Sequence, residues 1–336
     1  MSTTPLRRGD WVEVLAPSEI LATLDDAGAI DRLPFMPEMA RYCGRRFRVD
    51  TRTERVCDTV GYSGSRRIAD AVMLEDLRCD GASHGGCQAE CRYIWKEAWL
   101  RRIDPQSRPR RNVAADELDA LIRRVSATVQ QTVGEGAGGQ RRWSCQTTEL
   151  LNASAGLNTL DMKTYLREVT TGNVAVPKFL RVMCKATVWE PMRKLRLLTA
   201  EGLLRGTGAP AEAQPALGLQ PGEWVRVKSA AQIAATLSPT GHHRGLSFDR
   251  EMLPFCGKVC RVKKRVTRII DDRDGRMINI KTDCIVLENV VCSGECSARR
   301  VFCSRAIVSF WRECWLERVE AAAVPAQAEQ PVARSA

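Results

Sequence analysis

Alternating apolar and polar residues predict short strands at both ends of the first hundred residues. Trp11–Val14 has an alternating pattern in which Val12 and Val14 flank Glu13, and residues 47–57 and 71–77 are rich in apolar and β-branched side chains. Residues 100–103 predict a closing strand, whereas residues 20–24 predict about one helical turn. This part of the chain is therefore expected to form a small, mostly β domain.

A different spacing follows the third predicted strand. Cys87, Cys91, Trp95 and Trp99 recur every four residues, the spacing that places side chains along one face of a helix. The segment is therefore predicted to be helical, with its tryptophans in the core beside the cysteines.

The same pattern returns in the C-terminal part of the chain. An offset of 213 residues superposes Trp11 on Trp224, and the offset becomes 216 by the point where Trp99 meets Trp315. One register persists from residue 9 to residue 79, and the period is far longer than that of a solenoid. The sequence therefore predicts a duplicated domain.

The residues between the two copies have mainly helical periodicity. Residues 114–133 carry an apolar stripe, Asp161 is a predicted N-cap for a helix over 162–170, and residues 176–200 predict a longer helix interrupted at Pro191. The expected segments are a first cysteine-rich barrel module (9–103), a helical middle region (113–203), a flexible linker (204–220), a second cysteine-rich barrel module (221–319) and a disordered tail (320–336).

The two copies open with GDWVEV and GEWVRV, and each closes with a Trp-Leu pair followed by a short strand pattern. These ends resemble the first and last strands of SH3-like barrels, including KOW-type ones, over residues 9–103 and 221–319. The resemblance implies a five-stranded barrel with a long insert that carries the cysteines. The expected fold class is α+β, with two homologous small SH3-like β-barrel modules separated by a helical middle region.

Composition places the chain among globular proteins. Apolar residues make up 44% and charged residues 27%, and no run of about eighteen apolar residues is present to span a membrane. The first residues have no apolar core typical of a secretory signal, so a cytoplasmic location is expected.

The net charge of +11 is distributed unevenly. Residues 9–103 hold 14 basic against 16 acidic side chains, whereas residues 221–320 hold 18 against 12. The surplus favours an anionic partner such as nucleic acid, and a solvated basic surface is the alternative. The residues predicted to contact phosphates share one strand pattern in the second copy: Arg261, Lys263, Lys264, Arg265 and Arg268.

Fourteen cysteines are the chain's most distinctive chemistry, because disulfides are rare in the cytosol. Three cysteines occur in both copies, and each copy needs a fourth ligand to close a metal site. The predicted ligands are Cys43, Cys79, Cys87 and Cys91 in the first copy and Cys256, Cys292, Cys296 and Cys303 in the second. Alternative ligands are His84, Cys57, Cys260 and Cys284. Thiolates suit either zinc or an iron–sulfur cluster, one per repeat, and buried free thiols or disulfides are the alternatives.

The residues Cys79–His84 resemble the CDGSH motif of two-iron, two-sulfur proteins. They depart from it because four residues rather than three separate cysteine and histidine, and no upstream Cys-x-Cys pair is present. A Cys87–His84 nucleophile is conceivable, but the second copy has Arg300 in place of the histidine.

The sequence thus favours a metal-binding protein that acts as a binding or scaffold module, with nucleic acid or another protein as partner. An iron–sulfur redox or sensor protein and an accessory component of a biosynthetic enzyme are the alternatives, and no catalytic residue is predicted.

Overall fold

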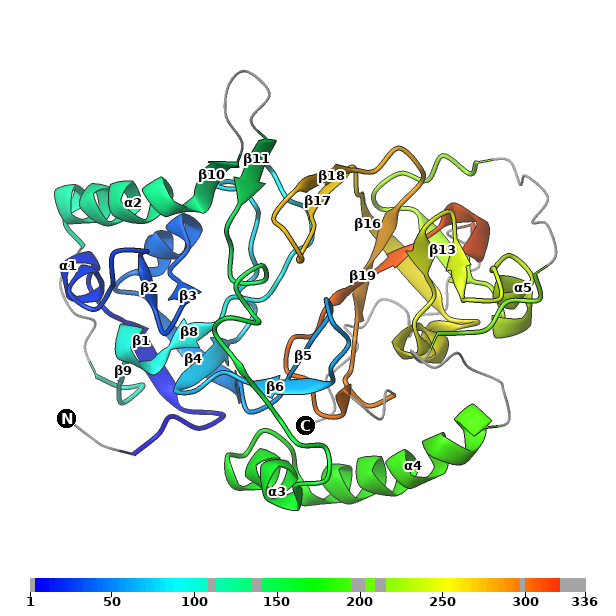
Figure 1. The fold of residues 1–336 in the computed structure, drawn as a ribbon, viewed down its shortest axis with the longest axis horizontal. Coiled ribbons are helices and arrows are strands. Elements are labelled where there is room, and N and C mark those ends of the chain that lie inside the picture. Colours follow the sequence, from blue (N-terminus) through cyan, green and yellow to red (C-terminus); the bar gives the residue numbers. More distant parts are fainter. Residues whose placement is uncertain are drawn as a thin grey trace. The chain divides into compact units, whose positions relative to one another are not determined.

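The computed structural model describes residues 4–107, 113–133, 140–194, 203–208, 216–296 and 300–320 (Figure 1). The chain forms two compact units. The first unit comprises residues 1–176 together with two later segments, 268–278 and 302–305, and the second comprises the remainder. The predicted linker lies in part, and the predicted tail almost wholly, outside the described residues.

A five-stranded antiparallel sheet, curved as a half-barrel, organises the first unit. Its strands follow the order β8 (Trp95–Lys96), β7 (Ala71–Leu74), β4 (Arg46–Arg52), β1 (Trp11–Val14) and β9 (Leu100–Arg102). The strand predictions hold because alternate residues of β1 and all of β7 supply buried side chains to one core.

Aromatic residues fill this core. Trp95 and Trp99 are fully buried, and Phe35 contacts the Trp99 ring edge-on with 5.1 Å between ring centroids. Short elements surround the sheet: α1 (Pro17–Leu21), the hairpin of β2 (Ala29–Ile30) and β3 (Leu33–Pro34), and the 3-10 helices η1 (Pro37–Tyr42) and η2 (Glu97–Trp99).

The helix predicted over Cys87 to Trp99 is wrong. Residues 87–94 have no helix, Trp95 pairs with Val72 in the sheet, and Trp99 ends the 3-10 helix η2. The two tryptophans are four residues apart because a strand and a single 3-10 turn both direct them into the core, so the spacing imitates a helix.

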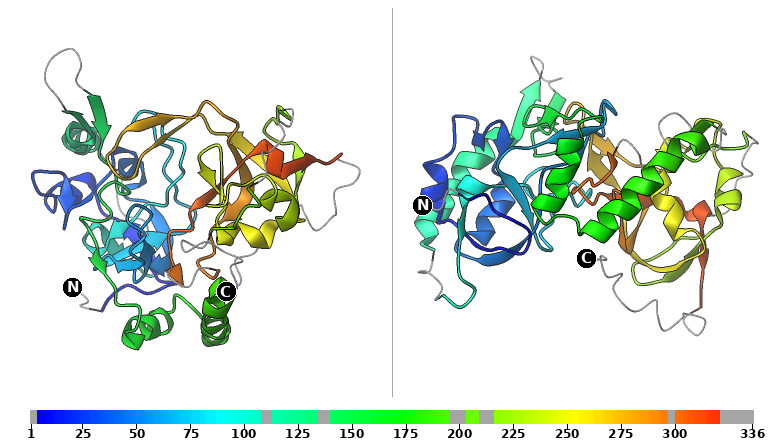
Figure 2. Two further views of the ribbon diagram at one scale, coloured as in Figure 1. Left: turned by 45° about the vertical axis from the view of Figure 1, so that its right-hand side comes forward. Right: turned by 90° about the horizontal axis from the view of Figure 1, so that it is seen from below.

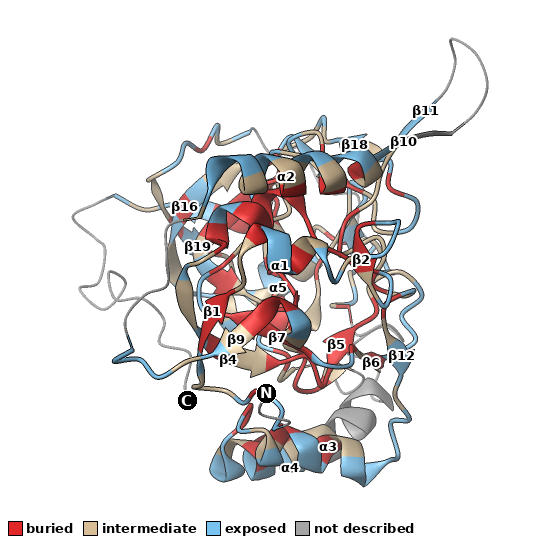
Figure 3. Cartoon of the chain, turned by 90° about the vertical axis from the view of Figure 1, so that its left-hand side faces the viewer, coloured by how far each residue is buried: buried red, intermediate tan, exposed pale blue. Residues whose placement is uncertain are grey.

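The helix α2 (Ala115–Val129) packs on α1 and η1 through the apolar stripe that the sequence predicts. Leu121 and Val125 are fully buried and Val129 nearly so, while the opposite side of the helix is exposed (Figure 3). The predicted helix ends early, because residues 130–133 form the strand β10 (Gln130–Val133), which pairs with β11 (Gln140–Trp143).

The rest of the middle region is less helical than expected. Residues 144–161 hold turns and the short strand β12 (Ala155–Gly156), which extends the sheet of β6 (Ser65–Arg67) and β5 (Val56–Cys57). The next helix is as predicted: α3 (Met162–Thr170) begins at Asp161, whose side chain accepts a hydrogen bond from Lys163 N at 3.0 Å. The last helix, α4 (Val176–Lys194), does not end at Pro191, and residues 195–200 lie outside the described part.

The second unit contains a sheet of its own (Figures 1 and 2). Its strand order is the same as that of the first sheet. Its strands are β20 (Val308–Trp311), β19 (Ile285–Val291), β16 (Val259–Arg265), β13 (Trp224–Val227) and β21 (Leu316–Arg318). The surrounding elements are α5 (Ala230–Ala234), β14 (His242–His243), β15 (Leu246–Ser247), η4 (Arg250–Phe255) and η6 (Glu313–Trp315).

The strand pairs of the two sheets are related by the offsets seen in the sequence. Trp11 lies opposite Arg48, and Trp224 lies opposite Arg261, so both partners differ by 213. Trp95 pairs with Val72 and Trp311 pairs with Ile285, so the tryptophans differ by 216 and their partners by 213. The sequence copies are therefore also copies in strand order and register, and the fold is α+β with antiparallel sheets.

Two segments of the second copy belong to the first unit. They are the hairpin that contains β17 (Arg268–Ile270) and most of β18 (Met277–Asn279), and residues 302–305. Among the described residues, no helix has the length and apolar character needed to cross a membrane.

Candidate metal centre

The candidate site starts from Glu38, on the 3-10 helix η1. Pro37 begins this helix, and the following apolar residues of η1 are buried in the core, so Glu38 is carried inward with them and is only 7% exposed. A buried carboxylate needs hydrogen-bond donors, and the loop after Cys79 supplies them.

That loop is fixed by its backbone. Cys79 N donates to Cys91 O at 2.8 Å, and the turn closes where Gly86 N donates to Gly81 O at 2.9 Å. Gly81 has a φ of +72°, and a Cβ there would lie 2.0 Å from Cys87 O, so only glycine fits. The turn places His84 between Glu38 and Cys79.

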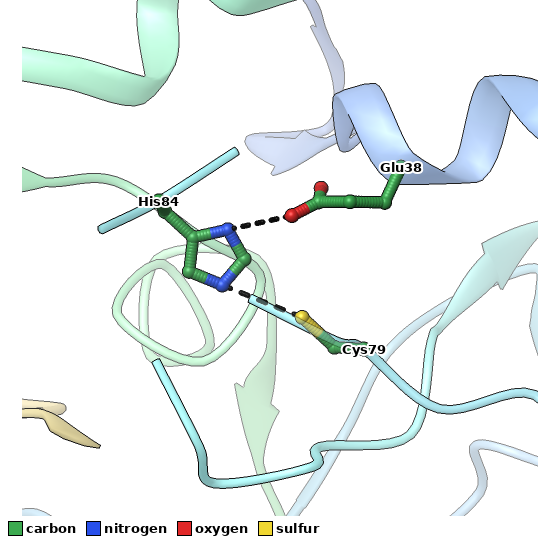
Figure 4. Close-up of side chains that lie close together, drawn as sticks. All are labelled: Glu38, Cys79 and His84. Carbon is green, nitrogen blue, oxygen red and sulfur yellow. Dashed lines mark hydrogen bonds and ion pairs between the residues drawn. The ribbon is translucent and has the colours of Figure 1, made fainter. Parts of the chain in front are cut away.

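The three side chains lie in a chain of contacts with the imidazole in the middle (Figure 4). His84 Nδ1 is 3.1 Å from Glu38 Oε1, and His84 Nε2 is 3.4 Å from Cys79 Sγ. Ser83 N also donates to Glu38 Oε1, at 2.9 Å. In the described part of the chain, no other group of three metal-ligating side chains has its ligand atoms within 4.8 Å of one another.

The pKa values of the carboxyl and the thiol in this site are shifted in opposite directions. Burial opposes ionisation of Glu38, but hydrogen bonds from His84 and Ser83 outweigh it and lower the pKa of the carboxyl from 4.5 to about 2. Burial, followed by the negative charges of Glu38 and Cys91, raises the pKa of the Cys79 thiol. The site therefore holds a carboxylate and a neutral thiol.

Two polar atoms near this chain of contacts are not satisfied. Among the described residues, Glu38 Oε2 and Tyr93 Oη are buried and have no hydrogen-bond partner. Each such atom is costly to bury without a partner, so an ion or water in contact with either atom would remove that cost.

The second copy is an internal control for this arrangement. Glu251, at the position of Glu38, accepts bonds from Ser293 N (3.1 Å), Ser293 Oγ (2.8 Å) and Cys296 N (2.8 Å). Arg300 replaces His84 and forms an ion pair with Asp249. Anchoring of the cysteine loop by glutamate is thus common to both copies, whereas the Cys–His pair occurs in the first copy alone.

The predicted sets of four cysteines do not form such groups. Cys79 forms a group with His84 and Glu38, and no two of its predicted cysteine partners form such a group with it. Cys87 Sγ accepts a hydrogen bond from Ile270 N at 3.4 Å. Cys43 is buried in the hydrophobic core of the first unit, where burial raises the pKa of its thiol to about 12. The repeat aligned these cysteines correctly but could not show where each sulfur points.

The second predicted set is divided between the units. Cys256, Cys292 and Cys296 belong to the second unit, whereas Cys303 belongs to the first. There Cys303 Sγ accepts a hydrogen bond from Cys57 N at 3.2 Å.

The alternative cysteine ligands are also dispersed. Cys57 lies buried in β5, Cys260 is half-buried in β16, and Cys284 is buried just before β19. Burial raises the pKa of the Cys260 and Cys284 thiols to about 11.

Sequence reasoning missed Glu38. Glu38 aligns with Glu251 in the two copies, so the repeat carried a signal for it.

The residues predicted to bind nucleic acid are not one surface. Arg261 and Lys263 are exposed on β16, and Lys264 is half-buried. Arg265 forms an ion pair with the buried Glu313, while Arg268 belongs to the first unit. The exposed part of the predicted stripe therefore consists of Arg261 and Lys263.

Comparison with known proteins adds no relative: no family model, no curated protein and no solved structure matches this chain.

Proposed function

We propose that this chain is a metal-binding protein whose first unit holds a single zinc ion between Cys79 Sγ and His84 Nε2. The observation that carries the proposal is the 3.4 Å separation of these two atoms, with Glu38 on the other nitrogen of the ring. No other site with this donor set occurs among the described residues.

The separation suits one ion. Bonds of about 2.3 Å to sulfur and about 2.0 Å to nitrogen, at a tetrahedral angle, place the two ligand atoms about 3.5 Å apart. Zinc-bound histidines usually donate their other ring N–H to a carboxylate, which fixes the ring and strengthens the ligand. Glu38 is placed to accept that hydrogen bond, at 3.1 Å.

The charges also favour a cation. The pKa of Cys79 is raised by burial and by nearby negative charge, so the thiolate forms only where a positive charge offsets both. A zinc ion supplies that charge and releases the thiol proton to solvent. With two ligands from this site, the remaining positions are open to water or to a group from a partner, which suits a binding or scaffold module.

The proposed stoichiometry is one ion at this site per chain. The second copy holds Glu251 by hydrogen bonds to its own loop and has Arg300 in place of the histidine. We propose that both copies are SH3-like barrels, the second without such an ion. Arg261 and Lys263, exposed on β16, support a proposal of weak, sequence-independent nucleic-acid binding by the second unit.

Metal analysis of the purified full chain tests the zinc proposal. After incubation with zinc and desalting, elemental mass spectrometry should find one zinc ion at this site per wild-type chain. The Cys79→Ser and His84→Asn variants should each lack this zinc. The matched control is Cys292→Ser, which removes the equivalent cysteine of the second copy and should keep that zinc. Circular dichroism checks that each variant is folded. A wild-type chain without zinc, or folded Cys79→Ser and His84→Asn variants with wild-type zinc content, would refute the proposal.

A further inference from the structure

The first unit contains pairs of hydrogen bonds that are exchanged between the two copies. Cys57 N donates to Cys303 Sγ at 3.2 Å, and Ile270 N donates to Cys87 Sγ at 3.4 Å. Residues 57 and 270 are equivalent by the offset of 213, and residues 87 and 303 by the offset of 216. Each copy therefore donates the same backbone N–H to the same cysteine of the other copy.

A second pair of bonds follows the same rule. Ser304 N donates to Arg55 O at 2.9 Å, and Gln88 N donates to Arg268 O at 3.1 Å. These donors and acceptors are again equivalent by 216 and 213. The reciprocal pattern is that of an isologous dimer interface, here within one chain.

The local two-fold axis passes where equivalent residues meet. Thr59 and Asp272 are equivalent by 213, and Thr59 Oγ1 donates to Asp272 Oδ2 at 2.8 Å. Both belong to the first unit. The two cysteine loops are thus arranged around the contact between Thr59 and Asp272.

Thiols from both copies gather around this axis. Cys57, Cys87 and Cys303 take part in the exchanged bonds, and the charge of Cys91 interacts with those of Cys87 and Asp272. All except Cys91, which is half-buried, are buried. The sulfurs come from three separate segments of the sequence, so the duplicated fold, rather than a local motif, brings them together.

A buried cation lies among these thiols. Arg305 is 8% exposed, and its Nη1 donates to Cys57 O at 2.9 Å and to Thr59 Oγ1 at 3.1 Å. Its ion pair with Asp272 is long, with 3.8 Å between Nη2 and Oδ2. The guanidinium charge interacts with Cys57, Cys91 and Cys303. A buried charge is costly unless it is compensated, so negative charge bound beside Arg305 would stabilise the guanidinium.

We infer that Cys57, Cys87, Cys91 and Cys303 bind one iron–sulfur cluster on this local two-fold axis, with Arg305 as the buried counter-cation. One zinc ion would need thiolate sulfurs about 3.8 Å apart. Among the described residues, no three of these sulfurs lie within 4.8 Å of one another, so they do not match the spacing of a single zinc site. Backbone N–H groups directed at cluster sulfurs are one of the features by which a protein sets reduction potential.

This inference uses none of the zinc ligands and does not depend on them. The inferred cluster site also differs from the sequence prediction of one metal site in each repeat, because its ligands come from both copies. The ligands lose their protons to solvent as they bind iron. The net negative charge of the cluster and its thiolate ligands would then compensate the buried positive charge of Arg305.

The test is anaerobic reconstitution of the full chain with ferric iron, sulfide and a thiol reductant, followed by desalting. Iron and acid-labile sulfide should be retained in the wild type, with visible charge-transfer absorption. Cys87→Ser and Cys303→Ser should each lose most of both. Cys292→Ser, outside the site, and Cys79→Ser, which removes a zinc ligand, should retain them.

The wild-type chain alone tests the inference, even where a variant does not fold. A folded wild-type chain that takes up no iron and sulfide refutes it, and so does a Cys57–Cys303 disulfide found in the anaerobic protein by mass spectrometry. Full retention of the cluster by folded Cys87→Ser or Cys303→Ser also refutes it. Zinc bound at Cys79 and His84 without any cluster would refute this inference and leave the zinc proposal standing.

Discussion

Replacing Glu38 by glutamine separates its role in the fold from its role at the candidate metal centre. The amide is nearly isosteric and its oxygen still accepts the bond from Ser83 N, now 2.9 Å from Oε1. What is lost is the negative charge beside His84 Nδ1. We therefore expect a folded variant with a weakened site.

The magnitude has two parts. Loss of a carboxylate that orients a zinc-bound histidine typically weakens metal binding by about 10–100-fold. The pKa of Glu38 falls from 4.5 to about 2 on folding, which bounds its contribution to the free energy of unfolding at about 3 kcal/mol. Because glutamine keeps the hydrogen bond from Ser83 N, we expect a smaller loss, of about 1–2 kcal/mol at pH 7.

The sign of the pH dependence follows from the lowered pKa. Wild-type stabilisation by Glu38 is fully present above pH 4.5 and is lost as the pH falls toward 2. The difference in unfolding free energy between wild type and Glu38→Gln should therefore stay constant from pH 7 to about 5 and shrink below 4.5. Urea unfolding across this range measures it, and zinc affinity is measured by competition with a chromophoric chelator.

Glu251→Gln is the matched control. Glu251 accepts three hydrogen bonds from the loop of its own copy, so its replacement should lower stability and leave zinc affinity unchanged. Equal zinc affinity in wild type and Glu38→Gln, within twofold, would show that Glu38 only anchors the loop. The zinc arrangement argued above would then be wrong.

Two further predictions follow from the structure. Burial outweighs the hydrogen bond from Asn173 and raises the pKa of Glu168 to about 8, so ionisation of this side chain should destabilise the fold as the pH rises from about 4.5 through 8. Glu168→Gln should therefore be more stable than wild type at pH 9, by up to about 4 kcal/mol, in urea unfolding, and the gain should be smaller at pH 6; no gain at pH 9 would contradict the burial argument. Replacing Arg261 and Lys263 by glutamate should weaken nucleic-acid binding several-fold at low salt, measured by fluorescence anisotropy, whereas unchanged binding would remove the basic strand as its cause.

The parts of the fold that the sequence predicted are those set by local patterns and by the repeat. Strand β1 follows from the apolar Val12 and Val14 on either side of Glu13, and helix α3 from the N-cap Asp161. The offset between copies appears again in the strand pairs, because the same buried positions recur in both. The predicted helix through Trp95 and Trp99 failed, since a strand followed by a 3-10 turn gives the same spacing.

The site was harder to predict for a physical reason. Glu38 reaches His84 from a 3-10 helix 46 residues earlier in the sequence, and nothing local to either residue marks the contact. The positions of Cys87 and Cys303 depend on which copy each loop packs against. A repeat predicts that two modules share a fold, but exchanged loops are set by tertiary packing.

Comparison of equivalent positions in the two copies also helps to distinguish structural residues from functional ones. Arg52 pairs with Glu97, and Arg265 pairs with Glu313, at equivalent positions. Because both copies keep this ion pair between the sheet and its last 3-10 helix, Arg265 is explained by the fold, and its charge is not free for nucleic acid.

The same reasoning applies to residues that differ between the copies. His84 is matched by Arg300, and Arg305 is matched by Ala89, so neither is required by the shared fold. Yet His84 is 2% exposed and lies against a carboxylate and a thiol, and Arg305 is a buried charge at the axis between the copies. In a duplicated chain, a residue that only one copy has is not needed for the shared fold and can serve another role. His84 and Arg305 are two such buried residues, and both lie where metal binding is proposed. Because the exchanged loops supply the thiols around Arg305 from both copies, neither copy alone could provide that second site.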